Sequence, residues 1–130
     1  MRIYESKYPI LILSHHNCEI HCCHLDGYKE NITALFNRMN IIEHELSSAP
    51  ADIKYKIWYN LDESKLDKSV MKSVTESIFR LQNHISKIAF IGLHGIYKWR
   101  FENMLKQILR NQVLPRAYFS DAELAKGWLI

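Results

Sequence analysis

One short segment, residues 15–24, concentrates the side chains that bind transition metals or act as nucleophiles. On an extended strand, alternate side chains point to opposite faces, so a tetrahedral ligand set here needs a partner strand or a distorted backbone. No Cys-x-x-Cys pair followed by a second pair is present. Spacing therefore supports a metal site less than composition does. The residues concerned are His15, His16, Cys18, His21, Cys22, Cys23 and His24.

The same segment offers a cysteine nucleophile, for which Glu19 or Asp26 would serve as the acidic orienting group. Nothing in the spacing requires this, and buried cysteines usually pack as small hydrophobic side chains. We expect no catalytic residue, no cofactor and no bound metal, so the chain is not expected to be an enzyme. Metal binding stays an alternative, with His21, Cys22, Cys23 and His24 as its ligands.

Two serines near the start of an expected helix, Ser64 and Ser69, are candidates for phosphorylation. A phosphate on Ser69 would lie near a helix amino terminus, where backbone N–H groups and the helix dipole favour negative charge. The competing interpretation is a solvated serine in the first helical turn.

A third candidate is the loop Gly92-Leu93-His94-Gly95, between an apolar strand and a helix. It lacks the P-loop Gly-Lys-Ser/Thr and the dinucleotide glycine triplet, so a turn that uses glycine in a left-handed conformation competes with phosphate binding. The aromatic residues Tyr97 and Trp99 suit a partner surface or, equally, a place in the core. The expected partner surface consists of Asn60, Asp62, Gly92, His94, Gly95, Tyr97, Lys98 and Trp99.

Composition limits the class of protein that can carry these residues. The chain has 130 residues, 48% hydrophobic and 24% charged, which suffices for one core, so residues 1–130 are expected to form a single domain. A net charge of +3 is too small to predict nucleic-acid binding. The three cysteines are expected to be reduced, as in the cytoplasm. No apolar run is long enough to predict membrane insertion or a signal sequence.

The periodicity of apolar residues alternates between strand-like and helical segments. Residues 8–14 and 18–25 are expected to pair as a hairpin, and further strands are expected at 54–61, 87–93 and 116–119. Apolar residues spaced three and four apart predict helices from Ile32 to Leu46 and from about Asp67 to His84. A third helix, which bears Phe101, Leu105, Ile108 and Leu109, is predicted after the loop through Gly92 and Gly95. A last helix is predicted after Ser120, capped by that hydroxyl and Glu123, with Leu124 on its buried face.

These segments predict an α/β fold with a mostly parallel sheet of four to five strands, about four helices and an antiparallel amino-terminal strand. Ile88-Ala89-Phe90-Ile91 is apolar on both faces, as expected of a central strand covered by helices on both sides. Partners of such sheets usually bind at the carboxyl ends of the strands.

Three stretches resemble the SpoIIAA-like branch of the STAS superfamily, the domain type of anti-sigma factor antagonists. They are residues 22–28 (Cys-Cys-His-Leu-Asp-Gly-Tyr), residues 87–92 (Lys-Ile-Ala-Phe-Ile-Gly) with the downstream Trp99, and residues 116–119 with the helix ending in Trp128-Leu129. The resemblance implies a phosphorylatable serine after the third strand. Where the family has an Asp-Ser-Ser-Gly-like sequence, this chain has residues 60–69, Asn-Leu-Asp-Glu-Ser-Lys-Leu-Asp-Lys-Ser.

The expected function is therefore a non-enzymatic interaction or regulatory module that binds a protein partner through strand-end loops, with homodimerisation as a further interaction. One alternative is a carrier that holds a small apolar or lipid-like ligand between sheet and helices, as relatives of this fold suggest. The other is the metal-binding protein described above. A pocket large enough for a ligand favours the carrier, whereas a tightly filled interior disfavours it.

Overall fold

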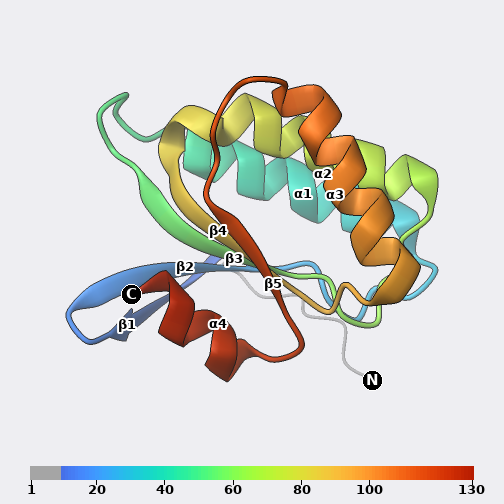
Figure 1. Cartoon of the computed structure of the whole chain (residues 1–130), viewed down its shortest axis with the longest axis horizontal. Helices are drawn as coiled ribbons and strands as arrows, with labels where there is room; N and C mark the ends of the chain where they lie inside the picture. Colours follow the sequence, from blue (N-terminus) through green and yellow to red (C-terminus); the bar gives the residue numbers. More distant parts are fainter. Residues whose placement is uncertain (1–9) are drawn as a thin grey trace.

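The computed structural model describes residues 10–130, which form a five-stranded sheet with helices on both faces (Figure 1). The strands follow one another across the sheet in chain order. β1 is antiparallel to β2, and β2 to β5 run parallel, so the predicted fold class is confirmed. The elements are β1 (Ile10–His15), β2 (Cys18–His24), α1 (Ile32–Ser47), β3 (Tyr55–Asn60), α2 (Lys68–Leu81), β4 (Ile85–Ile91), α3 (Gly95–Leu109), β5 (Arg116–Phe119) and α4 (Ala122–Leu129).

The two faces of the sheet are covered unequally. Helices α1, α2 and α3 lie on one face and α4 alone lies on the other (Figure 1). A large core forms under the three helices, and a smaller core around Trp58 and Ala89 forms under α4. Alternation along β3 explains the division, because Ile57 and Tyr59 enter the large core while Trp58 enters the small one.

The tetrapeptide Ile88–Ile91 lies inside the sheet, as predicted. β4 pairs with β3 on one side and β5 on the other, and Ile88, Ala89 and Phe90 are fully buried. Phe90 faces α3, where its ring lies 4.8 Å from that of Phe101, while Ala89 faces α4. A strand with helices on both faces needs apolar side chains at successive positions.

The hairpin joining β1 and β2 has a two-residue turn, His16-Asn17, with φ values of 49° and 62°. Positive φ at both positions matches the right-handed twist of the flanking strands. β1 extends to His15, one residue beyond the predicted end, and the predicted Tyr8 lies outside the described residues.

Helix α2 follows its prediction closely. The Asp67 carboxylate accepts a hydrogen bond from the Val70 N–H at 2.9 Å and caps the helix, and a 3-10 turn, Gln82–His84, continues it to the predicted end.

The prediction for α4 was wrong about its capping residue and about one residue of its buried face. Asp121 caps the helix, accepting from the Leu124 N–H at 3.0 Å, because the helix starts one residue later than a Ser120 cap requires. Leu124 is 55% exposed, since Ala125 and Leu129, four residues apart, form the stripe that faces the sheet.

Across residues 10–130, no helix combines the length and apolar character needed to span a membrane.

Candidate functional site

The loops that follow β2, β3 and β4 meet at the carboxyl edge of the sheet and are tied together by backbone hydrogen bonds. The Leu25 N–H donates to the Asn60 carbonyl at 2.9 Å, and the Leu61 N–H donates to the Ile91 carbonyl at 2.8 Å. The Gly27 N–H reaches the Asp62 carbonyl at 2.8 Å. Three residues predicted for the partner surface, Asn60, Asp62 and Gly92, are therefore neighbours, as parallel strands require.

Position 92 requires glycine because the backbone of Asp62 passes close to it. Its φ is +91°, and a Cβ atom at this position would lie 2.6 Å from the Asp62 nitrogen and 2.7 Å from the Asp62 Cα. Asn60 supports the same turn, since its side-chain oxygen accepts from the Asp62 N–H at 3.1 Å. Asn60 and Gly92 therefore build the turn at the edge of the sheet, where Asp62 is bonded through its backbone and is exposed.

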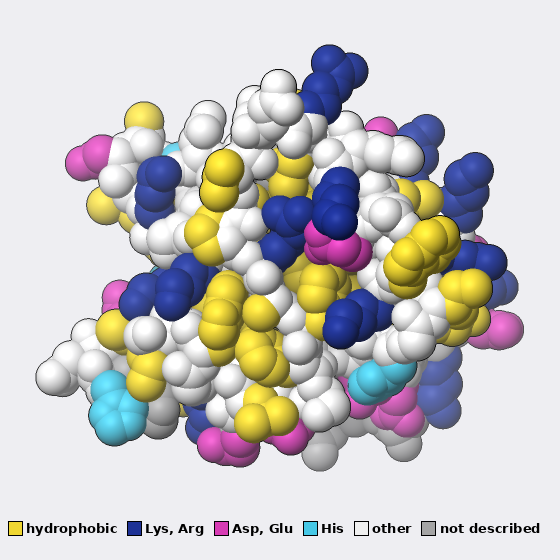
Figure 2. Space-filling view, in the orientation of Figure 1, with side chains coloured by type: hydrophobic (Ala, Val, Ile, Leu, Met, Phe, Trp, Pro, Cys, Tyr) yellow, Lys and Arg dark blue, Asp and Glu magenta, His cyan; other side chains and the backbone are white. Residues whose placement is uncertain are grey.

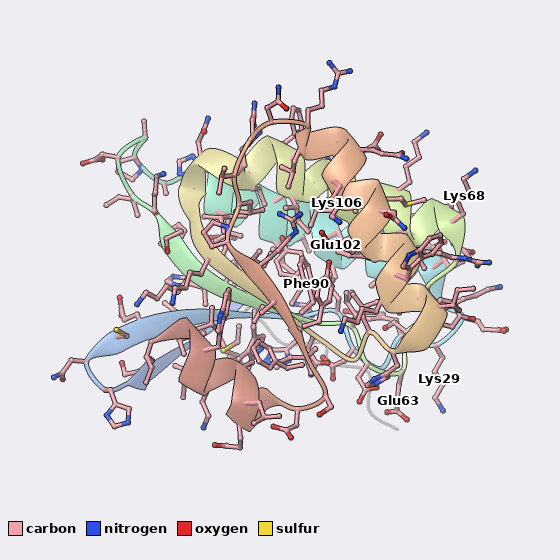
Figure 3. The ribbon with its side chains drawn as sticks, viewed as in Figure 1. Lys29, Glu63, Lys68, Phe90, Glu102 and Lys106 are labelled. Atoms are coloured by element: carbon pink, nitrogen blue, oxygen red, sulfur yellow. The ribbon has the colours of Figure 1, made fainter. Side chains whose placement is uncertain are left out.

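Ser64 joins the loops after β2 and β3. Its hydroxyl donates to the Leu25 carbonyl and accepts from the Tyr28 N–H at 3.2 Å. Beside it, the Lys29 N–H donates to the Glu63 carbonyl at 2.9 Å, and Figure 3 shows these two residues close together. A phosphate on Ser64 would remove the hydrogen bond donated to the Leu25 carbonyl, whereas the backbone hydrogen bonds between the two loops do not involve this hydroxyl.

Ser69, by contrast, is exposed in the first turn of α2. Its hydroxyl donates to the Asp67 carboxylate at 2.7 Å. Hydrogen bonds from the Val70 N–H and from Ser69 lower the pKa of Asp67, so this carboxylate stays charged. Of the two predicted phosphorylation sites, Ser69 is the accessible one, with an anion beside it.

The start of α3 presents aromatic and aliphatic side chains to solvent. Trp99 is 67% exposed and Tyr97 47%, so the alternative in which both face the core is wrong. Ile96 is also exposed, as are His94 and Lys98. Hydrophobic side chains gather among Lys and Arg side chains toward the right-hand end of Figure 2, where α2 and α3 begin (Figures 1 and 2).

A groove of about 790 Å³ lies between the first turn of α2 and the α3 residues from Tyr97 to Gln107. Sequence reasoning placed Trp99 and Tyr97 on a surface but missed the α2 side of it. The available signal was the spacing of Arg100, Asn103, Met104 and Gln107, which forms a second stripe along α3 beside its buried one. The lining residues are Leu66, Asp67, Lys68, Met71, Tyr97, Trp99, Arg100, Asn103, Met104 and Gln107.

An ion-pair cluster fixes the opposite side of α3 to β5. Arg116 donates to both carboxylate oxygens of Glu102, at 2.9 and 2.8 Å, and the Tyr118 hydroxyl donates to Glu102 at 2.6 Å (Figure 3 labels Glu102). Burial alone would raise the pKa of the Glu102 carboxyl, but the hydrogen bonds from Arg116 and Tyr118 outweigh it, so the pKa is lowered. α3 is thus held in place while its exposed side stays available.

The His/Cys segment is divided between the two faces of the sheet. Cys23 is buried beneath the three helices and Cys22 beneath α4, while Cys18 is half-buried with its sulfur 3.5 Å from the Lys56 Nζ. Among residues 10–130, no three His, Cys, Asp or Glu side chains are grouped so that they could hold a metal ion. The arrangement favours a packing role.

Burial also works against nucleophilic chemistry at these thiols. It raises the pKa of Cys22 to about 12 and that of Cys23 well above 9.0, so both stay protonated at neutral pH. Of the predicted orienting groups, Asp26 contacts His24 Nδ1 at 3.2 Å.

The space between the sheet and α1 to α3, where a carrier was predicted to hold its ligand, is occupied by buried side chains. Leu35, Ile57, Ile78, Phe90 and Leu105 are each at most 1% exposed there. The groove described above lies outside this core, between α2 and α3.

Comparison with known proteins identifies no relative: no family model matches the chain, and neither a curated protein nor a solved structure matches it. The resemblance to SpoIIAA-like domains stays a prediction based on the three stretches given above.

Proposed function

We propose that this chain is a non-enzymatic, cytoplasmic interaction module that binds a protein partner at the start of α3 and the adjoining groove. The observation that carries the proposal is the exposure of Trp99, 67%, next to Tyr97 and Ile96. Tryptophan and tyrosine contribute most to the binding energy of protein interfaces when they enter a partner's pocket.

The polar groups of the molecule support binding over catalysis. Burial is the main cause of the strongly raised pKa values of Cys22, Cys23 and Tyr59. These groups therefore stay protonated within the fold. Glu102 carries its charge inside an ion pair that positions α3. The surface at the start of α3 and along the adjoining groove is aromatic, aliphatic and basic, which suits recognition of another macromolecule.

A regulatory role for this module follows from the position of Ser69 and from the resemblance to anti-sigma factor antagonists. Ser69 lies in the first turn of α2 between Lys68, which lines the groove, and Val70, which is fully buried. A phosphate there would add close to two negative charges at one end of the groove. Phosphorylation would thus change the partner's affinity.

The test is site-specific photo-crosslinking. A photoreactive amino acid replaces Trp99 in one variant and Leu124 in a control variant; Leu124 is 55% exposed on α4, which lies on the other face of the sheet. We expect one defined protein to be crosslinked from position 99 alone, and the purified partner to bind the wild type but not Trp99→Ala. Equal crosslinking from both positions, or none, would contradict the proposal.

The groove itself supports a second candidate function, a carrier whose ligand lies between α2 and α3 and not between the sheet and the helices as predicted. Its volume of about 790 Å³ lies within the range of small-molecule sites, and Met71, Met104 and Leu66 give it apolar walls. Native mass spectrometry of the purified protein would detect a retained apolar ligand, and Met104→Gln should reduce its occupancy. A single mass equal to that of the bare chain would contradict this candidate.

A further inference from the structure

The groove at the start of α3 continues along the full seam between α2 and α3. A second hollow shares Met104 and Gln107 with the groove, and a third shares Gln107 and Ile108 with the second. The three hollows lead from Lys68, at the start of α2, to Phe79, near its end. At about 1.5 Å per residue, the seam is roughly 16 Å long, about three helical turns.

The floor of this α2–α3 seam is apolar and adaptable. Met71 and Met104 line its first part, and Ile108 and Phe79 its last. Methionine side chains are flexible and polarisable and are frequent in grooves that receive apolar residues of a partner. An occupant therefore needs a row of large apolar side chains about three turns long.

The rim of the seam is basic. Four basic residues border the three hollows, against two acidic ones, and one of the two, Asp67, is engaged with the Val70 N–H and the Ser69 hydroxyl. All four basic residues are exposed. The basic residues are Lys68, Lys72, Arg100 and Arg110, and the acidic residues are Asp67 and Glu76.

We infer that the α2–α3 seam binds an acidic amphipathic helix, whose apolar stripe lies on the floor and whose Glu and Asp residues face the basic rim. This inference rests on the proposed function and names the chemistry of the partner. Apolar anchors at positions i, i+3 or i+4, and i+7 are the usual way in which a helix binds a groove of this length. Trp99, at the open end of the seam, covers the first anchor.

A peptide selection tests this chemistry directly. The library consists of 15-residue peptides with leucine or phenylalanine fixed at the anchor positions and Glu, Lys or Gln randomised at all the others. The target is the full chain. We expect recovered binders to be enriched in Glu over Lys at least threefold. Equal recovery of Glu and Lys, enrichment of Lys, or no binder at all would overturn the inference.

The best recovered peptide is then measured by fluorescence anisotropy against charge-reversal variants. The double variant Lys68→Glu and Arg100→Glu should raise its Kd at least tenfold, and Ser69→Asp should raise it by a smaller factor. Lys54→Glu, an exposed change before β3 and away from the seam, is the control and should leave the Kd unchanged. A Kd equally affected by Lys54→Glu would reduce the effect to net charge and overturn the inference.

Failure of this inference can be distinguished from failure of the proposed function. A defined partner crosslinked at position 99 that binds through a basic or non-helical segment would refute the acidic helix but keep the interaction module. Binding to phosphatidylserine vesicles without peptide binding, or self-association abolished by Trp99→Ala, would refute the acidic helix by identifying another occupant. Absence of both crosslinking and peptide binding would refute both.

Discussion

β2 and the α2–α3 seam both carry residues that suggest chemistry, and the structure uses them in opposite ways. In β2, the thiols of Cys22 and Cys23 are buried on the two faces of the sheet, where burial keeps them protonated. Along the seam, less reactive side chains such as Trp99 and Arg100 are exposed beside a groove. Exposure and shape, rather than intrinsic reactivity, therefore single out the seam as the proposed binding surface. Substitutions in the sheet should alter stability, and substitutions in the seam should alter binding.

The largest expected difference concerns the thiols. Burial raises the pKa of Cys22 from 9.0 to about 12, which lowers its thiolate fraction at pH 8 roughly a thousandfold. Ellman's reagent should therefore modify one thiol of the native chain, Cys18, at least a hundred times faster than Cys22 and Cys23. Urea should make all three reactive, and Cys18→Ser should remove the fast phase. Two fast thiols in the native chain would restore the nucleophile hypothesis.

Replacing tryptophan by alanine should lower the free energy of unfolding strongly in the sheet and hardly at all in the seam. Trp58 is buried under α4, so Trp58→Ala should lower the free energy of unfolding by about 3–5 kcal/mol. Trp99→Ala removes an exposed ring and should change it by less than about 0.5 kcal/mol. Urea denaturation followed by far-ultraviolet circular dichroism measures both. A loss above 2 kcal/mol for Trp99→Ala would place that ring in the fold's packing and remove the basis for the seam.

The close approach of Gly92 to Asp62 predicts the next largest effect. Gly92→Ala forces a Cβ against the Asp62 backbone and strains a φ of +91°, so the free energy of unfolding should fall by roughly 2–4 kcal/mol. Gly127 in α4 is the matched control, because a Cβ there meets nothing within 4 Å. Gly127→Ala should raise the free energy of unfolding by about 0.5–1 kcal/mol. Equal urea midpoints for the two variants would contradict the loop geometry.

The two serines should respond differently to the loss of their hydroxyls. Ser64→Ala leaves the Leu25 carbonyl and the Tyr28 N–H without their partner, so we expect a loss of about 1–3 kcal/mol in the free energy of unfolding. Ser69→Ala removes only an exposed contact with Asp67 and should cost less than about 0.5 kcal/mol. Thermal unfolding of both variants measures the difference, and a larger cost at Ser69 would reverse the assignment of the accessible site.

The smallest expected effect is the pH dependence that His21 contributes. Burial lowers the pKa of His21 below 6.5, against an opposing effect of Glu19. As pH falls through 6.5, the unfolded state takes up a proton here that the folded state resists, so stability is lost toward the lower, folded-state pKa. His21→Phe should reduce the loss between pH 7 and pH 5 by a few tenths of a kcal/mol, because the ring is only partly buried and solvent screens its charge. A steeper slope in His21→Phe than in the wild type would contradict the sign of the pKa shift.

The fold was more predictable than the candidate site, for physical reasons. The tetrapeptide Ile88–Ile91 has no polar face, so a central strand is its natural place. The start of α4 was harder, because Ser120 and Asp121 are adjacent and either residue can cap a helix. Because α4 starts at Ala122, one residue later than predicted, its cap is Asp121.

The sequence left open whether Trp99 is exposed or packed in the core, because helical spacing gives the relative positions of residues but not which neighbour covers them. Trp99 lies two residues before Phe101, where the buried stripe of α3 begins, and only the placement of α2 beside α3 leaves the tryptophan at the edge of a groove. The seam is formed by residues of two helices, and its α2 side, Lys68 and Met71, carries no local signal of a site.

The most direct test of the central claim is the affinity of the selected acidic peptide for the wild type and for Trp99→Ala. If the seam is the binding surface, the Kd should rise roughly thirtyfold, the effect of losing an interface tryptophan worth about 2 kcal/mol, while the urea midpoint stays unchanged. An unchanged Kd would show that binding, if any, takes place elsewhere on the molecule.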